Sequence, residues 1–193
     1  MNQQNQGVKD EDLVSQTLAE PSSLGFIIER YEAKLRRYIS RLGVKNPEDA
    51  ADVLQEIFIK AYVNLNSFDT SMSFSSWIYR IAHNEAISWY RKQSVRPEGH
   101  LIIEGDEVLS LLSSKQEGAE LQFDHQINAT ELNKALTTLE PKYMQVLLLR
   151  YFEEKEYSEI SDILRIPVGS VGTLIARGKK QLQTVLNRDN LRI

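Results

Sequence analysis

Apolar residues recur at intervals of three and four along most of this 193-residue chain, and strand-like alternation is scarce. An α-helix turns once every 3.6 residues, so residues at such intervals share one face of a helix. In the segment FIIERYEAKLRRYISRLG, residues 26–43, the stripe consists of Ile27, Tyr31, Leu35, Tyr38 and Leu42. The spacing predicts an all-α fold.

A second helix is expected to begin at Pro47, because proline is tolerated in the first turn of a helix. Its predicted buried face consists of Val53, Leu54, Ile57, Phe58, Ala61 and Leu65. Residues 66–73, NSFDTSMS, have the composition of a turn, and a third helix is expected over 74–92. Further helices are expected over 132–140, 141–154, 157–165 and 167–186.

Charge is segregated along the chain, although the total is only -4. Residues 1–25 form an acidic extension, and residues 26–97 and 132–193 each carry a net charge of +3. Residues 98–131 carry 8 acidic and 1 basic side chains, a net charge of -7, and lack sustained periodicity. The pattern indicates two small helical domains, 26–97 and 132–193, joined by a flexible acidic linker.

Several classes of function find no support in the sequence. There is no cysteine, and His83, His100 and His125 are scattered without metal-ligand spacing. No glycine-rich phosphate loop or nucleophile motif is present. We therefore expect no catalytic residue, no metal and no cofactor. No apolar run is long enough to span a bilayer, and the polar start does not resemble a secretion signal, so a cytoplasmic protein without membrane contact is expected.

The C-terminal block has the parts of a helix-turn-helix, which reads DNA with its second helix. On the second helix, one arc is apolar and is expected to pack on the first: Val168, Val171, Ile175, Leu182 and Leu186. The opposite arc carries Ser170, Thr173, Arg177 and Lys180, side chains that reach base edges or phosphates in a major groove. The alternative is an ordinary amphipathic helix with a solvated face.

The segment FSSWIYRIAHNEAISWYRK, residues 74–92, mixes aromatic and basic side chains. Its predicted core face consists of Phe74, Ile78, Ile81, Ala82 and Trp89. A second stripe carries Trp77, Arg80, Asn84 and Arg91, and the preceding turn contributes Phe68. Flat rings beside basic groups hold unpaired nucleic acid. The alternative is that the aromatics are core and the arginines are merely solvated.

Two segments together resemble a known family. DAADVLQEIFIKAY, followed by FSSWIYRIAHNEAISWYRK, is similar to the second conserved region of bacterial sigma factors. LEPKYMQVLLLRYFEEKEYSEISDILRIPVGSVGTLIARGKKQL is similar to their fourth region. With these two regions, over 26–97 and 132–187, the chain resembles the extracytoplasmic-function (ECF) sigma factors. The resemblance implies a non-enzymatic factor that binds core RNA polymerase and directs promoter-specific initiation.

The resemblance also implies roles for matching positions. Asp52, Gln55 and Glu56 match positions that dock on the clamp helices of the largest polymerase subunit. Phe68 and Asn84 match the pocket for a flipped minus-ten base, with Arg80, Arg91 and Lys92 near phosphates. In the fourth region, the first helices would bind the flap of the second-largest subunit. The second helix of the helix-turn-helix would read the minus-thirty-five element, with Arg177, Lys179 and Lys180 on phosphates.

The chain departs from the family pattern in the recognition helix. Family members often have glycine where Arg165 stands, and basic residues where Gly172 and Leu174 stand. These departures put the strength or the usual consensus of upstream recognition in question. The acidic linker is open to two interpretations, mimicry of an RNA backbone in polymerase channels or a plain tether. An anti-sigma protein is a possible partner, and a polymerase-independent helix-turn-helix regulator is the alternative function.

Overall fold

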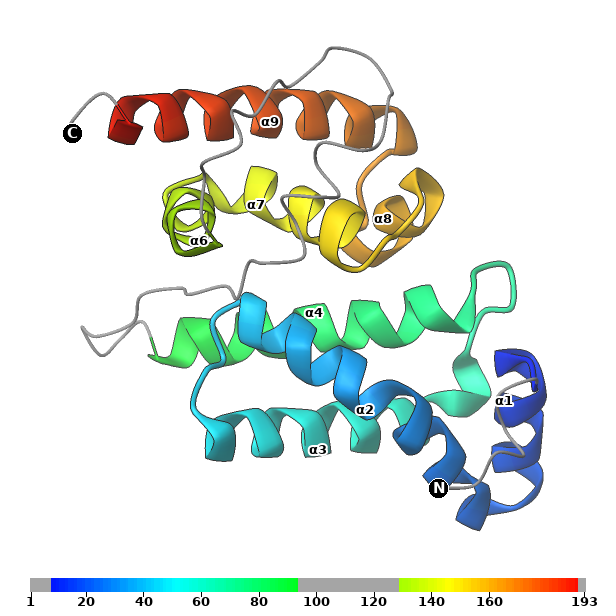
Figure 1. Cartoon of the computed structure of the whole chain (residues 1–193). Helices are drawn as coiled ribbons and strands as arrows, with labels where there is room; N and C mark the ends of the chain where they lie inside the picture. The colour runs from blue at the N-terminus through cyan, green and yellow to red at the C-terminus, as the bar shows by residue number, and fades with distance from the viewer. Residues whose placement is uncertain (1–7, 94–128, 191–193) are drawn as a thin grey trace. The chain divides into compact units, whose positions relative to one another are not determined.

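The computed structural model describes residues 8–93 and 129–190, and every regular element in these ranges is a helix. The predicted all-α fold is therefore confirmed (Figure 1). The described residues form two compact units, of which the first contains α1 to α4 and the second contains α6, α7, α9 and most of α8. Nearly all of the predicted linker, 98–131, lies outside the described residues.

Three long helices pack against one another in the N-terminal unit: α2 (Leu24–Arg41), α3 (Pro47–Val63) and α4 (Phe74–Gln93). After α2 the chain turns at Gly43, whose φ of 113° lies in the region that favours glycine. The side chain of Asn46 then caps α3 by accepting hydrogen bonds from the amides of Glu48 (2.8 Å) and Asp49 (3.4 Å). These local signals explain why the boundary between α2 and α3 can be predicted from the sequence.

The predicted buried faces of α2 and α3 are confirmed. All five residues of the stripe predicted over 26–43, and all six of the face predicted for the helix that begins at Pro47, are buried. On α4, Phe74, Ile78 and Ala82 are buried as expected, whereas Ile81 and Trp89 are half-buried. Tyr79, His83 and Ala86 are buried as well. Two of these, Tyr79 and His83, contact Tyr38 of α2. The buried face of α4 is therefore wider than the helical spacing predicted.

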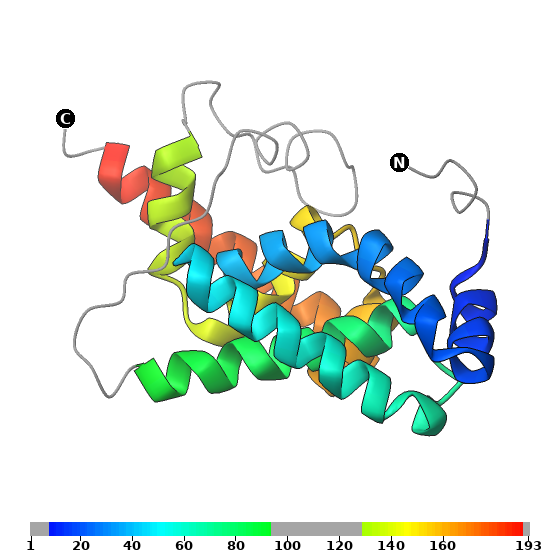
Figure 2. The ribbon, with the colours of Figure 1, turned by 90° about the horizontal axis from the view of Figure 1, so that it is seen from below.

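A helix that the sequence analysis did not assign, α1 (Asp10–Ala19), lies within the acidic extension. It is joined to α2 through the short 3-10 helix η2 (Pro21–Ser23). It packs against α2, against α4 and against the 3-10 helix η3 (Leu65–Ser67) that follows α3. In two perpendicular views α1 lies across one end of the α2–α4 bundle (Figures 1 and 2).

The C-terminal unit consists of four α-helices and one π-helical turn among its described residues. These are α6 (Ala129–Thr137), α7 (Pro141–Leu147), the π-helix η4 (Leu148–Phe152), α8 (Tyr157–Leu164) and α9 (Val168–Asn190). The helix predicted over 141–154 therefore changes to π geometry at Leu148 and ends at Phe152. Its continuation is blocked at Glu154, which has a φ of 51°.

α9 packs along α7 and α6. Gly178 favours the close approach of α7, since a Cβ there would lie at a tight 3.2 Å from Leu147 and Tyr143. Val171, Ile175, Leu182 and Leu186 are buried as predicted. The prediction for Val168 is wrong, because its side chain is 54% exposed. Val168 is the first residue of α9. Helical spacing gives the direction in which its side chain points, but it does not show whether a neighbouring helix extends as far as that first turn.

The turn between α8 and α9 uses an unusual backbone conformation. Arg165 adopts φ 53° and ψ 48°, the left-handed region, and caps the end of α8. Ser161 Oγ donates a 2.6 Å hydrogen bond to the carbonyl of Ile166 and closes the turn. A non-glycine residue in this region carries roughly 1–2 kcal/mol of strain. The structure thus gives a physical reason for the glycine that the family often has at this position.

Among the helices of the described ranges, none combines the length and the apolar character needed to cross a membrane.

Candidate nucleic-acid interface

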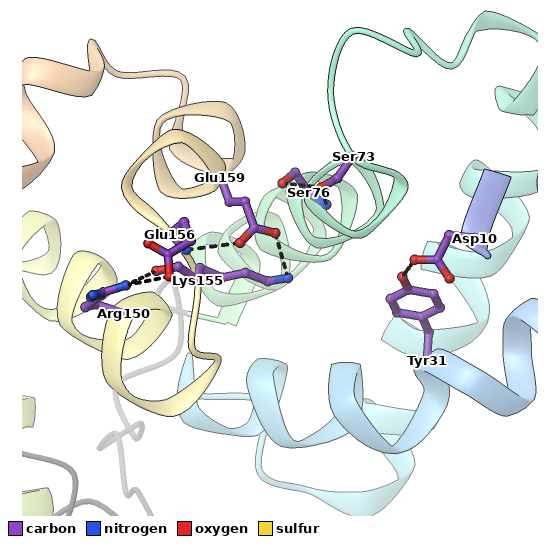
Figure 3. Close-up of polar contacts among 8 residues, drawn as sticks. All are labelled: Asp10, Tyr31, Ser73, Ser76, Arg150, Lys155, Glu156 and Glu159. Carbon is purple, nitrogen blue, oxygen red and sulfur yellow. Dashed lines mark hydrogen bonds and ion pairs between the residues drawn. The ribbon is translucent and has the colours of Figure 1, made fainter. Parts of the chain in front are cut away.

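The segment between α3 and α4 is shaped by its own polar contacts. Asp69 Oδ1 accepts a 2.9 Å hydrogen bond from the amide of Ser71. Ser73 Oγ accepts a 3.1 Å hydrogen bond from the amide of Ser76 and donates to Ser76 Oγ at 2.8 Å, which caps α4 (Figure 3). The Ser71 hydrogen bonds, with a smaller contribution from Arg80, hold the pKa of Asp69 below its ordinary value. These hydrogen bonds fix the backbone of the turn that follows Phe68.

Phe68 belongs to an aromatic cluster at the start of α4. Its ring centroid lies 5.5 Å from that of Phe74, with the planes perpendicular, and 5.4 Å from that of Trp77. The expectation of an exposed Trp77 is wrong, because its side chain is only 9% exposed. The rings of Phe68 and Phe74 pack against the indole ring. Trp77 is therefore a core residue, which was the alternative interpretation of this stripe. Phe68 itself is half-buried.

The rest of the predicted stripe on α4 is accessible in part. Asn84, Arg91 and Lys92 are exposed, and Arg80 is half-buried. Asn84 lies seven residues beyond Trp77, and Arg91 seven residues beyond Asn84, so each step advances about 10 Å along the same side of the helix. The arrangement places the amide of Asn84 and the guanidinium of Arg91 in a row that begins at the aromatic cluster, with Lys92 next to Arg91.

The outer side of α3 carries the other predicted contact residues of this unit. Asp52, Gln55 and Glu56 are all exposed. Glu56 forms a 3.3 Å ion pair with Lys60, which also binds Glu85 of α4 at 2.7 Å. The hydrogen bond from Lys60 to Glu85 is the main reason that the pKa of Lys60 is raised.

Exposed apolar side chains that were not predicted from the sequence continue this side of α3. Ile59 and Tyr62 are 48% and 41% exposed, and Val63 is 69% exposed. They follow Gln55 and Glu56 at intervals of three, four and seven residues, which was the available signal. The outer side of α3 therefore combines acidic and apolar groups.

On α9 the predicted polar arc is confirmed in part. Thr173, Arg177 and Lys180 are exposed, and Ser170 is half-buried. Lys179 is also half-buried, and its ammonium lies 6.0 Å from the ring centroid of Tyr151. Lys179 is thus partly engaged by an aromatic face, whereas Arg177 and Lys180 project from the helix.

Comparison with protein families accounts for both units. Residues 27–96 match the family model of sigma-70 region 2, and residues 129–182 match that of sigma-70, region 4. These ranges cover the helices that carry the predicted contact residues. The order of the two regions along the chain is the order predicted from the sequence.

Individual relatives agree with the family matches. The chain is 36% identical over 165 residues to the ECF RNA polymerase sigma factor SigW of Bacillus subtilis, covering 83% of this chain and 87% of SigW. Two solved structures share its fold. CnrH, in complex with the cytosolic domain of CnrY, aligns with a TM-score of 0.68 at 21% identity, over 93% of this chain and 98% of CnrH.

The second is the sigma factor RpoE of Bartonella quintana, in complex with the anti-sigma factor NepR. It aligns with a TM-score of 0.59 at 19% identity, over 84% of this chain and 96% of that one. The two regions in one chain, and a relative similar over most of both lengths, disfavour a polymerase-independent regulator. The chain belongs to the ECF family of RNA polymerase sigma factors.

Proposed function

We propose that this sigma factor, which directs promoter-specific initiation by core RNA polymerase, opens promoter DNA with its N-terminal unit and reads the upstream element with its C-terminal unit. The observation that carries the assignment is the row on α4. The row runs from Trp77 through exposed Asn84 to exposed Arg91, and half-buried Phe68 of the preceding turn lies against Trp77 at its start. Phosphoryl transfer belongs to the polymerase, and the sigma factor contributes binding free energy rather than catalysis.

The outer side of α3 is the proposed docking site for core polymerase. Asp52, Gln55 and Glu56 supply polar contacts for the clamp helices of the largest subunit, and all three are accessible. The exposed Ile59, Tyr62 and Val63 add an apolar area beside them. Contiguous exposed apolar groups next to charged ones are typical of protein interfaces.

The proposed minus-ten site uses the loop and α4 together. Unstacking a base costs a few kcal/mol, and capture of the flipped base in a pocket offsets that cost. Phe68 supplies the aromatic wall and Asn84 the hydrogen-bonding amide, while buried Trp77 supports Phe68 from below rather than stacking on the base itself. Arg80, Arg91 and Lys92 are the proposed phosphate contacts.

The proposed minus-thirty-five site is the exposed side of α9. Ser170 and Thr173 lie near the start of the helix, where residues of a recognition helix reach base edges. Arg177 and Lys180 are placed to contact phosphates, and Lys179 contributes less because Tyr151 engages it. The short helices before α9 are the proposed contact for the flap of the second-largest subunit.

Two further assignments follow from the family. We place the protein in the cytoplasm, where the polymerase works. An anti-sigma protein is a proposed partner, since the RpoE of Bartonella quintana was solved with the anti-sigma factor NepR and shares the fold.

Transcription with purified components tests the proposal. The chain is mixed with sigma-free core polymerase and a template library with randomised upstream regions, and transcripts with a shared start-site context are expected. Core polymerase alone, and the chain alone, serve as controls. Transcripts that do not depend on the chain, or DNA binding by the chain without polymerase as a symmetric dimer, would refute the assignment.

Variants locate the minus-ten site. Asn84→Ala and Phe68→Ala are expected to lower transcription from duplex promoters at least tenfold while leaving the affinity for core polymerase unchanged. A premelted template should recover part of the activity, because the cost of opening has been removed. Asn187→Ala, an exposed amide near the end of α9, is the matched control. Normal melting by both minus-ten variants would remove these residues from the site.

A further inference from the structure

The helix α1 is part of the core of the N-terminal unit rather than a loose extension. Leu13, Val14 and Thr17 are buried against α2, α4 and η3. Burial of the two aliphatic side chains, Leu13 and Val14, removes apolar surface from water and so stabilises the docked position of α1. The position of α1 is therefore fixed relative to the helices that it covers, including η3, which ends one residue before Phe68.

One side chain at the start of α1 binds two residues of α2. Asp10 Oδ1 forms a 2.6 Å ion pair with Arg30. Its Oδ2 accepts a hydrogen bond from the hydroxyl of Tyr31 (Figure 3). The Arg30 and Asp10 side chains are 19% and 24% exposed, so water screens this pair only partly. Burial, together with Asp10, raises the pKa of Tyr31 above its ordinary value, which keeps the hydroxyl a neutral donor.

The ring of Tyr31 connects this contact to the aromatic cluster. Its centroid lies 5.7 Å from that of Phe74, with an angle of 75° between the planes. Phe74 in turn meets Phe68 edge-on at 5.5 Å and Trp77 at 5.6 Å. Such ring pairs prefer edge-on or offset orientations, so each ring restricts the orientation of the next. An uninterrupted series of contacts therefore runs from Asp10 through Tyr31 and Phe74 to Phe68.

We propose that α1, acting through Asp10 and Tyr31, positions Phe68 for capture of the unpaired promoter base. This inference rests on the proposed function of Phe68. Asp10 and Tyr31 do not contact DNA in this scheme and are positioning residues. A pocket holds its ligand well when the side chains that line it are held by packing and hydrogen bonds behind them.

The test uses Tyr31→Phe in the full-length chain. The substitution keeps the ring against Phe74 and removes the hydroxyl that binds Asp10, so the core remains filled. The probe is a single-stranded non-template oligonucleotide that spans the minus-ten element of a promoter selected with the wild-type holoenzyme. It carries 2-aminopurine at the flipped position, and binding by the holoenzyme is followed by fluorescence.

We expect Tyr31→Phe to weaken oligonucleotide binding threefold to tenfold, with unchanged affinity for core polymerase. Asp10→Asn, which breaks the ion pair with Arg30, should have an effect in the same direction. Glu32→Gln is the matched control, since it breaks an exposed 2.8 Å ion pair with Arg36 on the same helix without touching the aromatic cluster. A merely structural role would lower the thermal stability without changing base capture at a temperature where the protein is folded.

A double-mutant cycle with Phe68→Ala decides between direct and general effects. If α1 acts through Phe68, Tyr31→Phe has no further effect in the Phe68→Ala background. An equal loss in both backgrounds, or no loss in the wild-type background, overturns the inference. Failure of the proposed function is a separate result, in which Phe68→Ala itself leaves base capture unchanged.

Discussion

Tyr38 and His83 form a buried polar pair between α2 and α4. The Tyr38 hydroxyl lies 2.9 Å from His83 Nδ1, and the histidine is 8% exposed. Burial lowers the pKa of His83 from its ordinary 6.5 to about 4, because the charged imidazolium is poorly solvated there. The folded protein therefore keeps His83 neutral at a pH where the unfolded chain already binds a proton.

This difference makes the stability of the N-terminal unit depend on pH. Above pH 6.5 His83 is neutral in the folded and in the unfolded protein, so its titration does not lower the stability there. As the pH falls toward 4, the unfolded state gains a proton that the folded state does not, at a cost of about 1.4 kcal/mol per pH unit. We expect the free energy of unfolding in urea to fall by up to about 3 kcal/mol across this window.

Removing the titrating group isolates this effect. His83→Phe keeps a ring of similar size and is expected to flatten the pH dependence between 6.5 and 4. A pH dependence as steep in the variant as in the wild type would assign the effect to other groups.

At the level of whole helices, two glycines of α9 occupy different surroundings. A Cβ at Gly172 would lie 3.4 Å from the ring of Tyr157, an ordinary contact. A Cβ at Gly178 would lie 3.2 Å from both Tyr143 and Leu147 of α7. Alanine is favoured over glycine in a helix by about 1 kcal/mol, so the two positions test whether helix propensity or packing dominates.

We expect Gly172→Ala to raise the free energy of unfolding by up to about 1 kcal/mol. At Gly178 a side chain meets Leu147 and Tyr143 at a tight 3.2 Å already at its Cβ, and Gly178→Val is expected to destabilise the protein by about 1–3 kcal/mol. Urea unfolding followed by circular dichroism measures both. Gly172→Val is the control, because the neighbour there is the exposed side chain of Tyr157, which can move aside. Equal effects of valine at the two sites would contradict the packing argument.

The helices of the N-terminal unit differ in how well their sequences predict them. α2 and α3 have wide apolar stripes, a glycine turn and a capping asparagine, so their faces and boundary were predictable. α1 was not, because Leu13 and Val14 are too few among polar and acidic residues to set a period. Only tertiary packing on α2, α4 and η3 distinguishes it from an acidic tail.

The candidate site shows the same division. The side of α4 on which Asn84 and Arg91 lie was predictable from helical spacing, and so was the polar arc of α9. The burial of Trp77 was not, because it depends on Phe68 folding back from the preceding turn. The exposure of Val168 depends on where α9 begins relative to its neighbours. Spacing fixes the direction of a side chain, and neighbours fix its accessibility.

For the molecule as a whole, a total charge of -4 conceals two basic regions on either side of an acidic connector. DNA binding responds to local charge, because each phosphate that a cation neutralises releases counterions. In the C-terminal unit, Arg177 and Lys180 are exposed, whereas Lys179 lies against Tyr151. The three cations should therefore contribute unequally to the salt dependence of upstream binding.

We expect Lys180→Ala to reduce the slope of log affinity against log salt concentration by about 1, the loss of one phosphate contact. Lys179→Ala, adjacent in sequence and identical in charge change, should reduce it by clearly less. The measurement is holoenzyme binding to upstream duplex over a series of potassium chloride concentrations. Equal slopes for the two variants would indicate that Lys179 leaves Tyr151 when DNA is present.

The burial of α1 bears on how fragments of this protein behave. The region recognised by family comparison begins at residue 27, after α1 has ended. A polypeptide trimmed between Ala19 and Leu24 would retain every side chain assigned to promoter contact. It would nevertheless uncover apolar surface on α2 and α4 and strip Arg30 and Tyr31 of their shared carboxylate. Isolating the recognised domain by its sequence boundaries would thus yield an incomplete hydrophobic core.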